Sequence, residues 1–443
     1  MKLIAVTILF ALITQCVNAG ELISEKELLD SIHGVKKFGD GRDWFLEKRF
    51  GLFVTWGLYS IEGWQEQQQQ RLEIPRWEYG KLFSEFDPGN FDPDAWIDLA
   101  EKAGMEYITF VAKHMDGFCM WDTEQTDFKV TNSPYGKDIL AQLAQACHRR
   151  NFPLSIYYCL VDNHHINYPA NGTGHGLKHP EQGDKPDLEK YLYYVREQVR
   201  ELCANYGQIH GFWWDVNQTG HIDTSFNAMI RELQPGIVIN NRGFGDGDFS
   251  TPEREWHQFI NNDLSFDKPV EACNSVGKES WGYRIGEDYH TSEYLMRGIS
   301  NMLAKGGNYL LNVGPDANGV IPVQAVERLE KIGRWLATVK EAFYGAVPVN
   351  ELTDNRDILL TRKEDDLFVI LLNRPVANGI GLLPFALKPQ NAILLNDGSQ
   401  VQYEVELLPS AHLSGLLQLH LKNLPVSKFC NEIMVIKLEK VFH

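Results

Sequence analysis

A carboxylate stands at the end of an apolar run in which the sequence reads His210-Gly-Phe-Trp-Trp-Asp215. Such a run is typical of a buried strand, and Asp215 would then place one negative charge at the tip of that strand. Burying a lone carboxylate beside tryptophans costs free energy, so proteins that do so commonly use the group. The bland alternative is an aspartate that caps the following helix. Asp215 is therefore the first candidate for a catalytic residue.

Polar and aromatic side chains also gather at or near the ends of the other apolar runs. In chain order these groups are Thr55-Trp56, Glu66, Lys113-His114-Met115-Asp116, Tyr157-Tyr158, Asn240-Asn241-Arg242, Glu253, Glu271 and Asn312. Aromatic rings can cover the apolar faces of a sugar while charged groups bind its hydroxyl groups, so this set is typical of a carbohydrate site. Two carboxylates from different strands are also what glycoside hydrolysis needs. One attacks the anomeric carbon or activates water, and the other protonates the leaving oxygen.

Other chemistries fit the sequence less well. His114 and Asp116 lie two residues apart, and His164 and His165 follow a later strand, but no HExxH or similar metal-ligand spacing occurs. The GxSxG motif of serine hydrolases is absent, and no GxGxxG follows an early strand. We therefore expect neither a metal nor a cofactor.

The elements that must position these groups alternate between strand-like runs and amphipathic helices from Phe50 to Leu336. We expect strands over 51–56, 107–114, 154–160, 210–215, 237–242, 269–273 and 309–313. We expect helices over 94–102, 138–150 and 188–202, around 229–233, and over 292–304 and 323–339. Roughly seven β–α repeats indicate parallel strands joined by helical crossovers. Because the polar groups gather at successive strand ends, we expect an α/β fold with a closed, TIM-like (β/α) barrel that need not be regular.

The pattern changes after Val347-Pro348. Short apolar runs without intervening helices, with turn sequences such as Asn396-Asp-Gly, predict a C-terminal antiparallel β-sandwich. We therefore divide the chain into a catalytic barrel over residues 20–345 and a β-sandwich over residues 346–443.

Residues 1–19 resemble a secretory signal peptide. Lys2 provides the positive end, Leu3 to Ile13 the apolar core, and Val17-Asn-Ala19 the cleavage site. We expect a periplasmic or extracellular protein after cleavage near Ala19, without a membrane span, because no later apolar stretch is long enough. The net charge of −17 argues against nucleic-acid partners and favours a neutral oligosaccharide or glycoconjugate.

Six segments carry a resemblance to a known family. They are Phe50-Gly-Leu-Phe-Val-Thr-Trp-Gly57, Lys113-His-Met-Asp-Gly-Phe-Cys-Met-Trp121, Phe212-Trp-Trp-Asp215, residues 241–253, Ser280-Trp-Gly-Tyr283 and Lys305-Gly-Gly-Asn-Tyr-Leu-Leu-Asn-Val-Gly-Pro315. In this order, over about residues 45–345, they resemble the α-L-fucosidases of glycoside hydrolase family 29. The resemblance implies a retaining exo-α-L-fucosidase that acts through a covalent glycosyl–enzyme.

The resemblance also implies a role for each matching residue. Asp215 matches the nucleophile and Glu253 the acid/base, with Glu271 as the alternative acid or as a buried brace. Positions that contact the sugar match Thr55, Glu66, His114, Met115, Tyr157 or Tyr158, Trp213 and Arg242. Trp213 as plain core and Arg242 as a structural partner of Asp215 are the bland alternatives.

Three positions depart from the family pattern. The family usually has histidine at Thr55 and at Met115, and tryptophan at Gln67. Each change removes a hydrogen-bond donor that would face a sugar hydroxyl group. Two further hypotheses therefore stand beside a fucosidase: a relative with altered specificity, such as an α-L-galactosidase, and a catalytically silent carbohydrate-binding protein.

Overall fold

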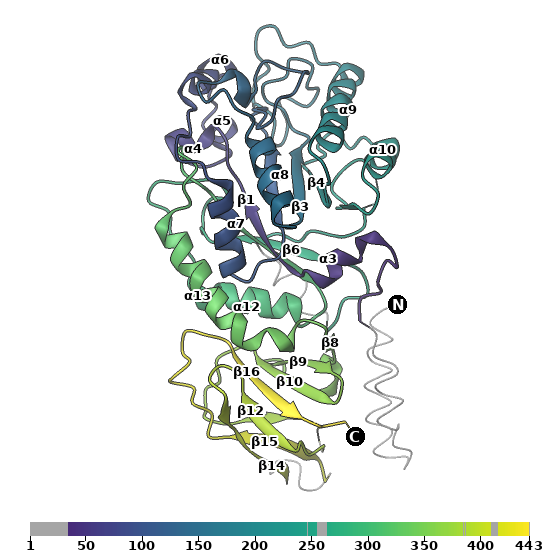
Figure 1. Cartoon of the computed structure of the whole chain (residues 1–443), viewed down its shortest axis with the longest axis vertical. Coiled ribbons are helices and arrows are strands. Elements are labelled where there is room, and N and C mark those ends of the chain that lie inside the picture. Colours follow the sequence, from purple (N-terminus) through teal and green to yellow (C-terminus); the bar gives the residue numbers. More distant parts are fainter. Residues whose placement is uncertain are drawn as a thin grey trace.

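The computed structural model describes residues 34–245, 247–254, 264–383, 385, 387–408 and 415–442. An α/β part lies at one end of the molecule and an all-β part at the other (Figure 1). The predicted signal peptide lies outside the described residues. No helix within the described ranges combines the length and apolar character that crossing a membrane requires.

Seven parallel strands form the centre of the α/β part, and every residue in them is buried. They are β1 (Phe50–Val54), β2 (Ile108–Lys113), β3 (Leu154–Cys159), β4 (Gly211–Asp215), β5 (Val238–Ile239), β6 (Glu271–Ser275) and β7 (Asn308–Val313). Their order in the sheet is β5-β4-β3-β2-β1-β7-β6. Continuous apolar runs are expected of strands that are covered on both faces, which explains why all seven could be recognised in the sequence.

A segment without regular strand structure lies between the two edges of this sheet. Phe249 forms a parallel bridge with Asn240, next to β5, and Ser250 forms one with Val270, next to β6. Glu253 then bridges Cys273 on β6. Residues 249–253, the seam, therefore occupy an eighth position and close the sheet into a ring. The predicted barrel is confirmed, and it is irregular at the seam.

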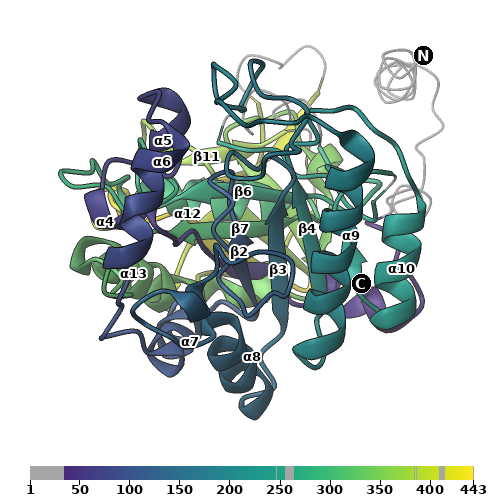
Figure 2. The same ribbon diagram turned by 90° about the horizontal axis from the view of Figure 1, so that it is seen from above.

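Helices surround the ring, as the view along it shows (Figure 2). The longer ones are α7 (Pro93–Lys102), α8 (Ile139–Arg149), α9 (Leu188–Asn205), α10 (Ser225–Leu233), α12 (Ser292–Leu303) and α13 (Val323–Val339). The short ones are η1 (Gly41–Asp43), α3 (Trp44–Glu47), α4 (Tyr59–Glu62), α5 (Gln68–Arg71), α6 (Arg76–Tyr79), η2 (Gly80–Glu85), η3 (Val130–Asn132), η4 (Lys340–Ala342) and η5 (Asn350–Leu352). Asp92 caps α7 by accepting hydrogen bonds from the backbone N–H groups of Asp94 and Ala95.

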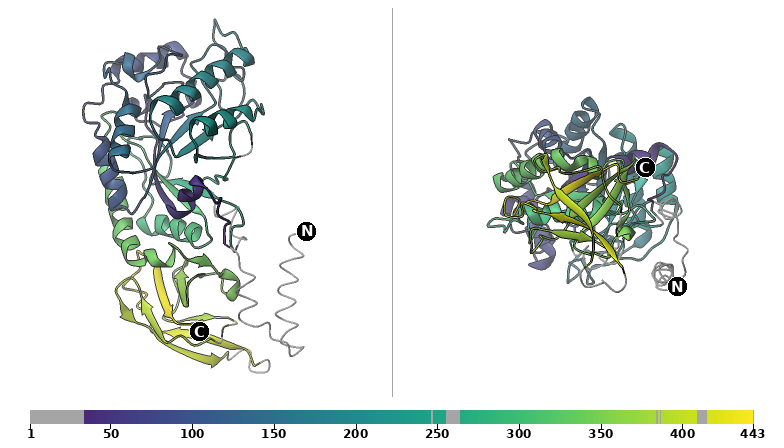
Figure 3. Two further views of the ribbon diagram at one scale, coloured as in Figure 1. Left: turned by 45° about the vertical axis from the view of Figure 1, so that its right-hand side comes forward. Right: turned by 90° about the horizontal axis from the view of Figure 1, so that it is seen from below.

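The all-β part consists of two antiparallel sheets (Figure 3). One contains β8 (Val347–Pro348), β9 (Leu359–Lys363), β10 (Asp366–Leu371), β12 (Asn391–Leu394), β13 (Ser399–Gln400) and β16 (Met434–Glu439). The other contains β11 (Ile380–Leu382), β14 (Gln402–Leu407) and β15 (Leu417–Lys422). Val369 and Leu419 belong to the core between the sheets, while Phe368 and Val435 pack with the barrel core. The larger sheet is therefore covered on both faces, as in a sandwich.

Candidate active site

Asp215 ends β4 at the mouth of the barrel; one carboxylate oxygen accepts a hydrogen bond and the other forms an ion pair. The hydroxyl group of Tyr157 donates a hydrogen bond to Oδ2. The Nη2 atom of Arg242 lies 2.9 Å from Oδ1. Burial, followed by the charge of Asp215, raises the pKa of Tyr157 well above its ordinary value, so the phenol keeps its proton and donates. The carboxylate is thus held in one orientation.

Arg242 joins Asp215 to a second carboxylate. Its Nη1 atom contacts Oε1 of Glu253, and its guanidinium lies over the ring of Trp213 at 5.0 Å from the centroid. Burial opposes the charge of Arg242, but Asp215 and Glu253 outweigh it and raise its pKa above the ordinary value. The Glu253 side chain is 39% exposed and that of Asp215 is 13% exposed. One carboxylate of the pair is therefore shielded, and the other can exchange a proton with solvent.

His114 lies across the barrel from Glu253, the second carboxylate of this pair. In a ring of eight positions, β2 is four positions from the seam in either direction. The His114 ring stacks on Tyr157 at 5.9 Å between centroids and meets Tyr59 edge-on at 5.6 Å. Burial lowers the pKa of His114 despite the opposing charges of Glu66 and Asp215. A neutral imidazole can donate from one ring nitrogen and accept at the other, which suits a sugar hydroxyl group.

Glu66 ties two loops at the mouth of the barrel to each other. Its Oε2 atom accepts hydrogen bonds from the Ser280 hydroxyl group at 2.9 Å and from the backbone N–H groups of Trp281 and Gly282 at 3.0 and 3.1 Å. The loop after β1 is thereby fixed to the loop after β6. Glu66 itself is 4% exposed, so its contacts within the protein are fully formed without a ligand.

Glu271 lies at the beginning of β6, which corrects its assignment to a strand end. Its Oε1 atom accepts a hydrogen bond from the Tyr107 hydroxyl group at 2.6 Å, and Oε2 accepts one from Nε1 of Trp213 at 3.0 Å. Burial raises the pKa of Glu271 to about 7, although both donors act to lower it. Because Arg242 links Asp215 to Glu253 and not to Glu271, the geometry favours Glu253 as the acid.

Of the other residues predicted to contact the sugar, some lie at the mouth of the barrel and others are buried away from it. Tyr157 reaches Asp215, whereas Tyr158 points the other way and donates to Oε1 of Gln198 on α9 at 2.6 Å. Tyr158 is therefore not part of this site, because neighbouring residues of a strand face opposite sides. Met115 is 2% exposed and belongs to the hydrophobic core.

Thr55 and Gln67, two positions at which the chain departs from the family pattern, have hydrogen-bond partners within the protein. The Thr55 hydroxyl group donates to Oδ1 of Asn312 at 2.7 Å. The Oε1 atom of Gln67 accepts a hydrogen bond from Nε of Arg71 at 2.8 Å, on the exposed surface of α5. Neither contact leads toward Asp215.

Some residues at the mouth of the barrel were not singled out from the sequence. Trp281 lies 6.2 Å from Phe53 between ring centroids, and the guanidinium of Arg254 lies 4.6 Å over its ring. The motif Ser280-Trp-Gly-Tyr283 was the available signal. Behind His114, Lys113 forms a fully buried ion pair with Asp162 at 2.9 Å. A lysine at the end of a buried strand was the signal there, because it requires a partner.

The rings of the histidines considered as metal ligands pack on aromatic side chains. His164 stacks on Phe128 at 3.8 Å between ring centroids, and His165 packs on Tyr194 at 4.2 Å. Asp116 accepts a hydrogen bond from the Tyr79 hydroxyl group at 2.8 Å. Within the described ranges, no three His, Cys, Asp or Glu side chains are grouped as a metal would require.

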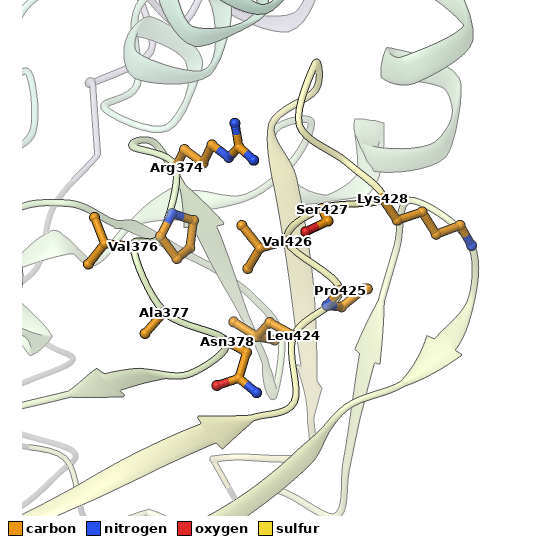
Figure 4. A pocket seen from close by; sticks show the side chains of 10 residues that line it. Arg374, Val376, Ala377, Asn378, Leu424, Pro425, Val426, Ser427 and Lys428 are labelled. Carbon is orange, nitrogen blue, oxygen red and sulfur yellow. The ribbon is translucent and has the colours of Figure 1, made fainter.

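A wide cleft of about 760 Å³ lies elsewhere, in the all-β part (Figure 4). Two loops, residues 374–378 and 424–428, line it. The described residues that line it include no carboxylate, so it lacks the pair of groups that glycoside hydrolysis needs. The chemistry belongs to the mouth of the barrel.

The chain is similar to proteins of one known family. The family described as Alpha-L-fucosidase matches residues 30–341. Tissue alpha-L-fucosidase of Bos taurus is 27% identical over 405 residues, covering 84% of this chain and 83% of that protein. Alpha-L-fucosidase isoenzyme 1 from Paenibacillus thiaminolyticus has a TM-score of 0.78 and 32% identity, covering 90% of this chain and 98% of its own. The alpha-fucosidase of Thermotoga maritima in complex with a mechanism-based inhibitor has a TM-score of 0.72 and 26% identity, covering 94% and 99%.

Proposed function

We propose, on the premise that this chain belongs to the alpha-L-fucosidase family, that it is a retaining exo-α-L-fucosidase that removes terminal α-L-fucosyl residues from neutral glycans. The observation that carries the proposal is Arg242, whose single guanidinium contacts both Asp215 and Glu253. Two carboxylates that contact the same guanidinium suit a double displacement, for which retaining glycosidases place the two carboxylates about 5–5.5 Å apart.

In the first step Asp215 is the nucleophile. One of its oxygens forms a bond to the anomeric carbon while the bond from that carbon to the leaving oxygen breaks. Tyr157 and Arg242 orient the carboxylate and stabilise its negative charge before the attack. Glu253 gives its proton to the leaving oxygen in the same step.

In the second step a water molecule attacks the anomeric carbon and gives a proton to Glu253. The bond to Asp215 breaks, and two inversions leave the configuration unchanged. Glu253 suits both proton transfers because its side chain reaches solvent, whereas Glu271 is 2% exposed and hydrogen-bonded on both oxygens.

The remaining groups of the site bind the sugar. His114 offers a neutral imidazole, Trp213 and Trp281 offer aromatic surface, and Glu66 fixes the loop that carries Trp281. The presence of both Asp215 and Glu253 disfavours a silent binding protein. The relatives reported above are described as fucosidases, which disfavours an α-L-galactosidase.

Hydrolysis of nitrophenyl α-L-fucoside, α-L-galactoside and β-D-glycosides, followed by anomer-resolved NMR, tests the proposal. We expect turnover of the fucoside, with the α-anomer of L-fucose as the first product. First release of the β-anomer, or a clear preference for the galactoside, would contradict it.

We also propose that the protein is exported and that the mature chain begins near Gly20. Lys2, the apolar core that follows it and the small residues up to Ala19 support this proposal. N-terminal sequencing of the protein recovered from its native cells tests it. A mature chain that retains residues 2–19 would contradict it.

A further inference from the structure

A segment between β3 and α9, residues 170–177, is held against the loop that follows the proposed nucleophile. Its anchor is Gln218, three residues after Asp215. The Nε2 atom of Gln218 donates hydrogen bonds to the backbone oxygen of Thr173 at 2.5 Å and to its hydroxyl oxygen at 2.9 Å. The Oε1 atom of Gln218 accepts one from the backbone N–H of His175 at 2.6 Å. The segment is therefore fixed beside β4.

The same segment is also held by the loop that follows β1. The Nε2 atom of Gln70 donates to the backbone oxygen of Gly174 at 3.2 Å. Gly174 has a φ of 51°, and a Cβ atom there would lie 2.5 Å from Oε1 of Gln218. Glycine is therefore required for this close approach.

The two anchors determine where the segment runs. In the sheet, β3 and β2 lie between β4 and β1. A segment tied to the loops after β4 and β1 therefore lies at the mouth of the barrel between those loops. His114, which directly follows β2, lies at the same mouth. His175 is exposed to solvent. Gln218 holds its backbone N–H, and it directly follows Gly174, whose backbone oxygen Gln70 holds. After burial, the charge of a protonated His175 is among the causes that lower the pKa of His114.

We infer that His175 is a specificity-determining residue that donates a hydrogen bond to the C4 hydroxyl group of the terminal sugar. This inference rests on the proposed function, because the leaving oxygen on C1 must face Glu253. In a pyranose ring C1 and C4 are opposite atoms. Since β2 lies four positions from the seam, the C4 hydroxyl group then faces the side of the pocket where His114 and His175 lie.

His175 also supplies what the sequence lacks elsewhere. The chain has Thr55 and Met115 at two positions where a histidine would face the sugar, and the structure closes both into its interior. His164 and His165 do not replace them, because the His164 ring stacks on Phe128 and the His165 ring packs against Tyr194. An imidazole on the segment at the mouth of the barrel would restore one donor to the pocket.

The test is a double-mutant cycle between the enzyme and its ligand. Dissociation constants of L-fucose and 4-deoxy-L-fucose are measured by calorimetry for the full-length wild type and for His175→Ala. We expect His175→Ala to weaken L-fucose binding about 10-fold and the 4-deoxy sugar by less than about twofold, because a bond already absent cannot be lost again. His179→Ala is the matched control, an exposed histidine four residues further on. It should leave both constants unchanged.

Equal losses for the two sugars, or no loss for either, would overturn the inference. Hydrolysis of nitrophenyl α-L-fucoside by the wild type is measured in parallel. Turnover with retention alongside equal losses would overturn the role of His175 and leave the proposed function standing. A wild type that neither binds L-fucose nor hydrolyses the fucoside would overturn both.

Discussion

The hydroxyl group of Thr55 donates a hydrogen bond to the side-chain oxygen of Asn312, with 2.7 Å between the two oxygen atoms. The contact links the end of β1 to β7. The Nδ2 atom of Asn312 in turn donates a hydrogen bond to the backbone oxygen of Trp281 at 2.6 Å. Thr55 thus supports the wall of the pocket from within the protein. Its hydroxyl proton is therefore already donated within the protein.

The double substitution Thr55→His and Met115→His should therefore fail to improve a fucosidase. Both side chains are 2% exposed, and adding ring atoms to a packed interior costs about 1–3 kcal/mol of folding stability. We expect kcat/KM for α-L-fucoside and α-L-galactoside to decline together and the melting temperature to fall. Thr55→Val is the control that keeps the volume and removes only the donor. A selective rise for the fucoside would contradict this prediction.

Removing the nucleophile should abolish turnover without unfolding the protein. Asp215→Ala and Asp215→Asn should lower kcat by roughly 10³-fold or more, since no other group attacks the anomeric carbon. Circular dichroism should show an unchanged fold. Added azide should restore turnover of an activated fucoside by Asp215→Ala, with an inverted product. Activity within a few-fold of wild type would rule out the assigned role.

The loss of activity on removing the acid should depend on the leaving group of the substrate. Glu253→Ala should slow substrates with poor leaving groups by roughly 10²–10⁴-fold and slow activated aryl fucosides far less, because only poor leaving groups need protonation. The measurement is kcat/KM over a series of aryl fucosides of increasing phenol pKa. Glu271→Gln is the comparison variant. If Glu271→Gln shows the selectivity and Glu253→Ala does not, the acid is Glu271.

Glu271 should make folding stability depend on pH. Burial raises its pKa to about 7 in the folded protein, above the ordinary value, so the folded state binds more protons than the unfolded state between about pH 4.5 and 7. Its contribution is therefore most favourable at low pH and is lost as the pH rises to about 7, by up to about 3 kcal/mol. Urea unfolding at pH 5 and pH 8 measures the change. Glu271→Gln should show a smaller change, and an equal one would contradict the assignment.

Much of the fold could be predicted from the sequence, because the spacing of apolar residues indicates where the helices and strands lie. The helix expected over 323–339 has those bounds in the structure, and all seven expected barrel strands are present. The seam was missed because Asp248-Phe-Ser-Thr-Pro offers one apolar side chain and no run. In the all-β part, β14 has no continuous apolar run, because polar and apolar residues alternate over Gln402-Tyr-Glu-Val-Glu-Leu407 and none of them is fully buried.

Within the site, sequence alone located the strand ends but not the direction of each side chain. Tyr157 and Tyr158 are chemically identical neighbours, and only the pleat of β3 decides which one meets Asp215. A shift of two residues in the start of β6 moves Glu271 from a strand end to the barrel interior. The placement of His175 depends on contacts with Gln218 and Gln70, which are distant in the sequence and show no shared pattern.

Because the seam closes the barrel, the backbones that carry the two catalytic carboxylates differ in their resistance to local unfolding. Asp215 stands on a strand with ladder neighbours on both sides, whereas Glu253 is joined to β6 through isolated bridges. Regions with few backbone contacts open at a lower free energy than the whole domain. Gentle heating should therefore first displace the proton donor and leave the nucleophile in place. The enzyme would then lose natural glycans as substrates while it still cleaves activated aryl fucosides, at temperatures where it remains folded.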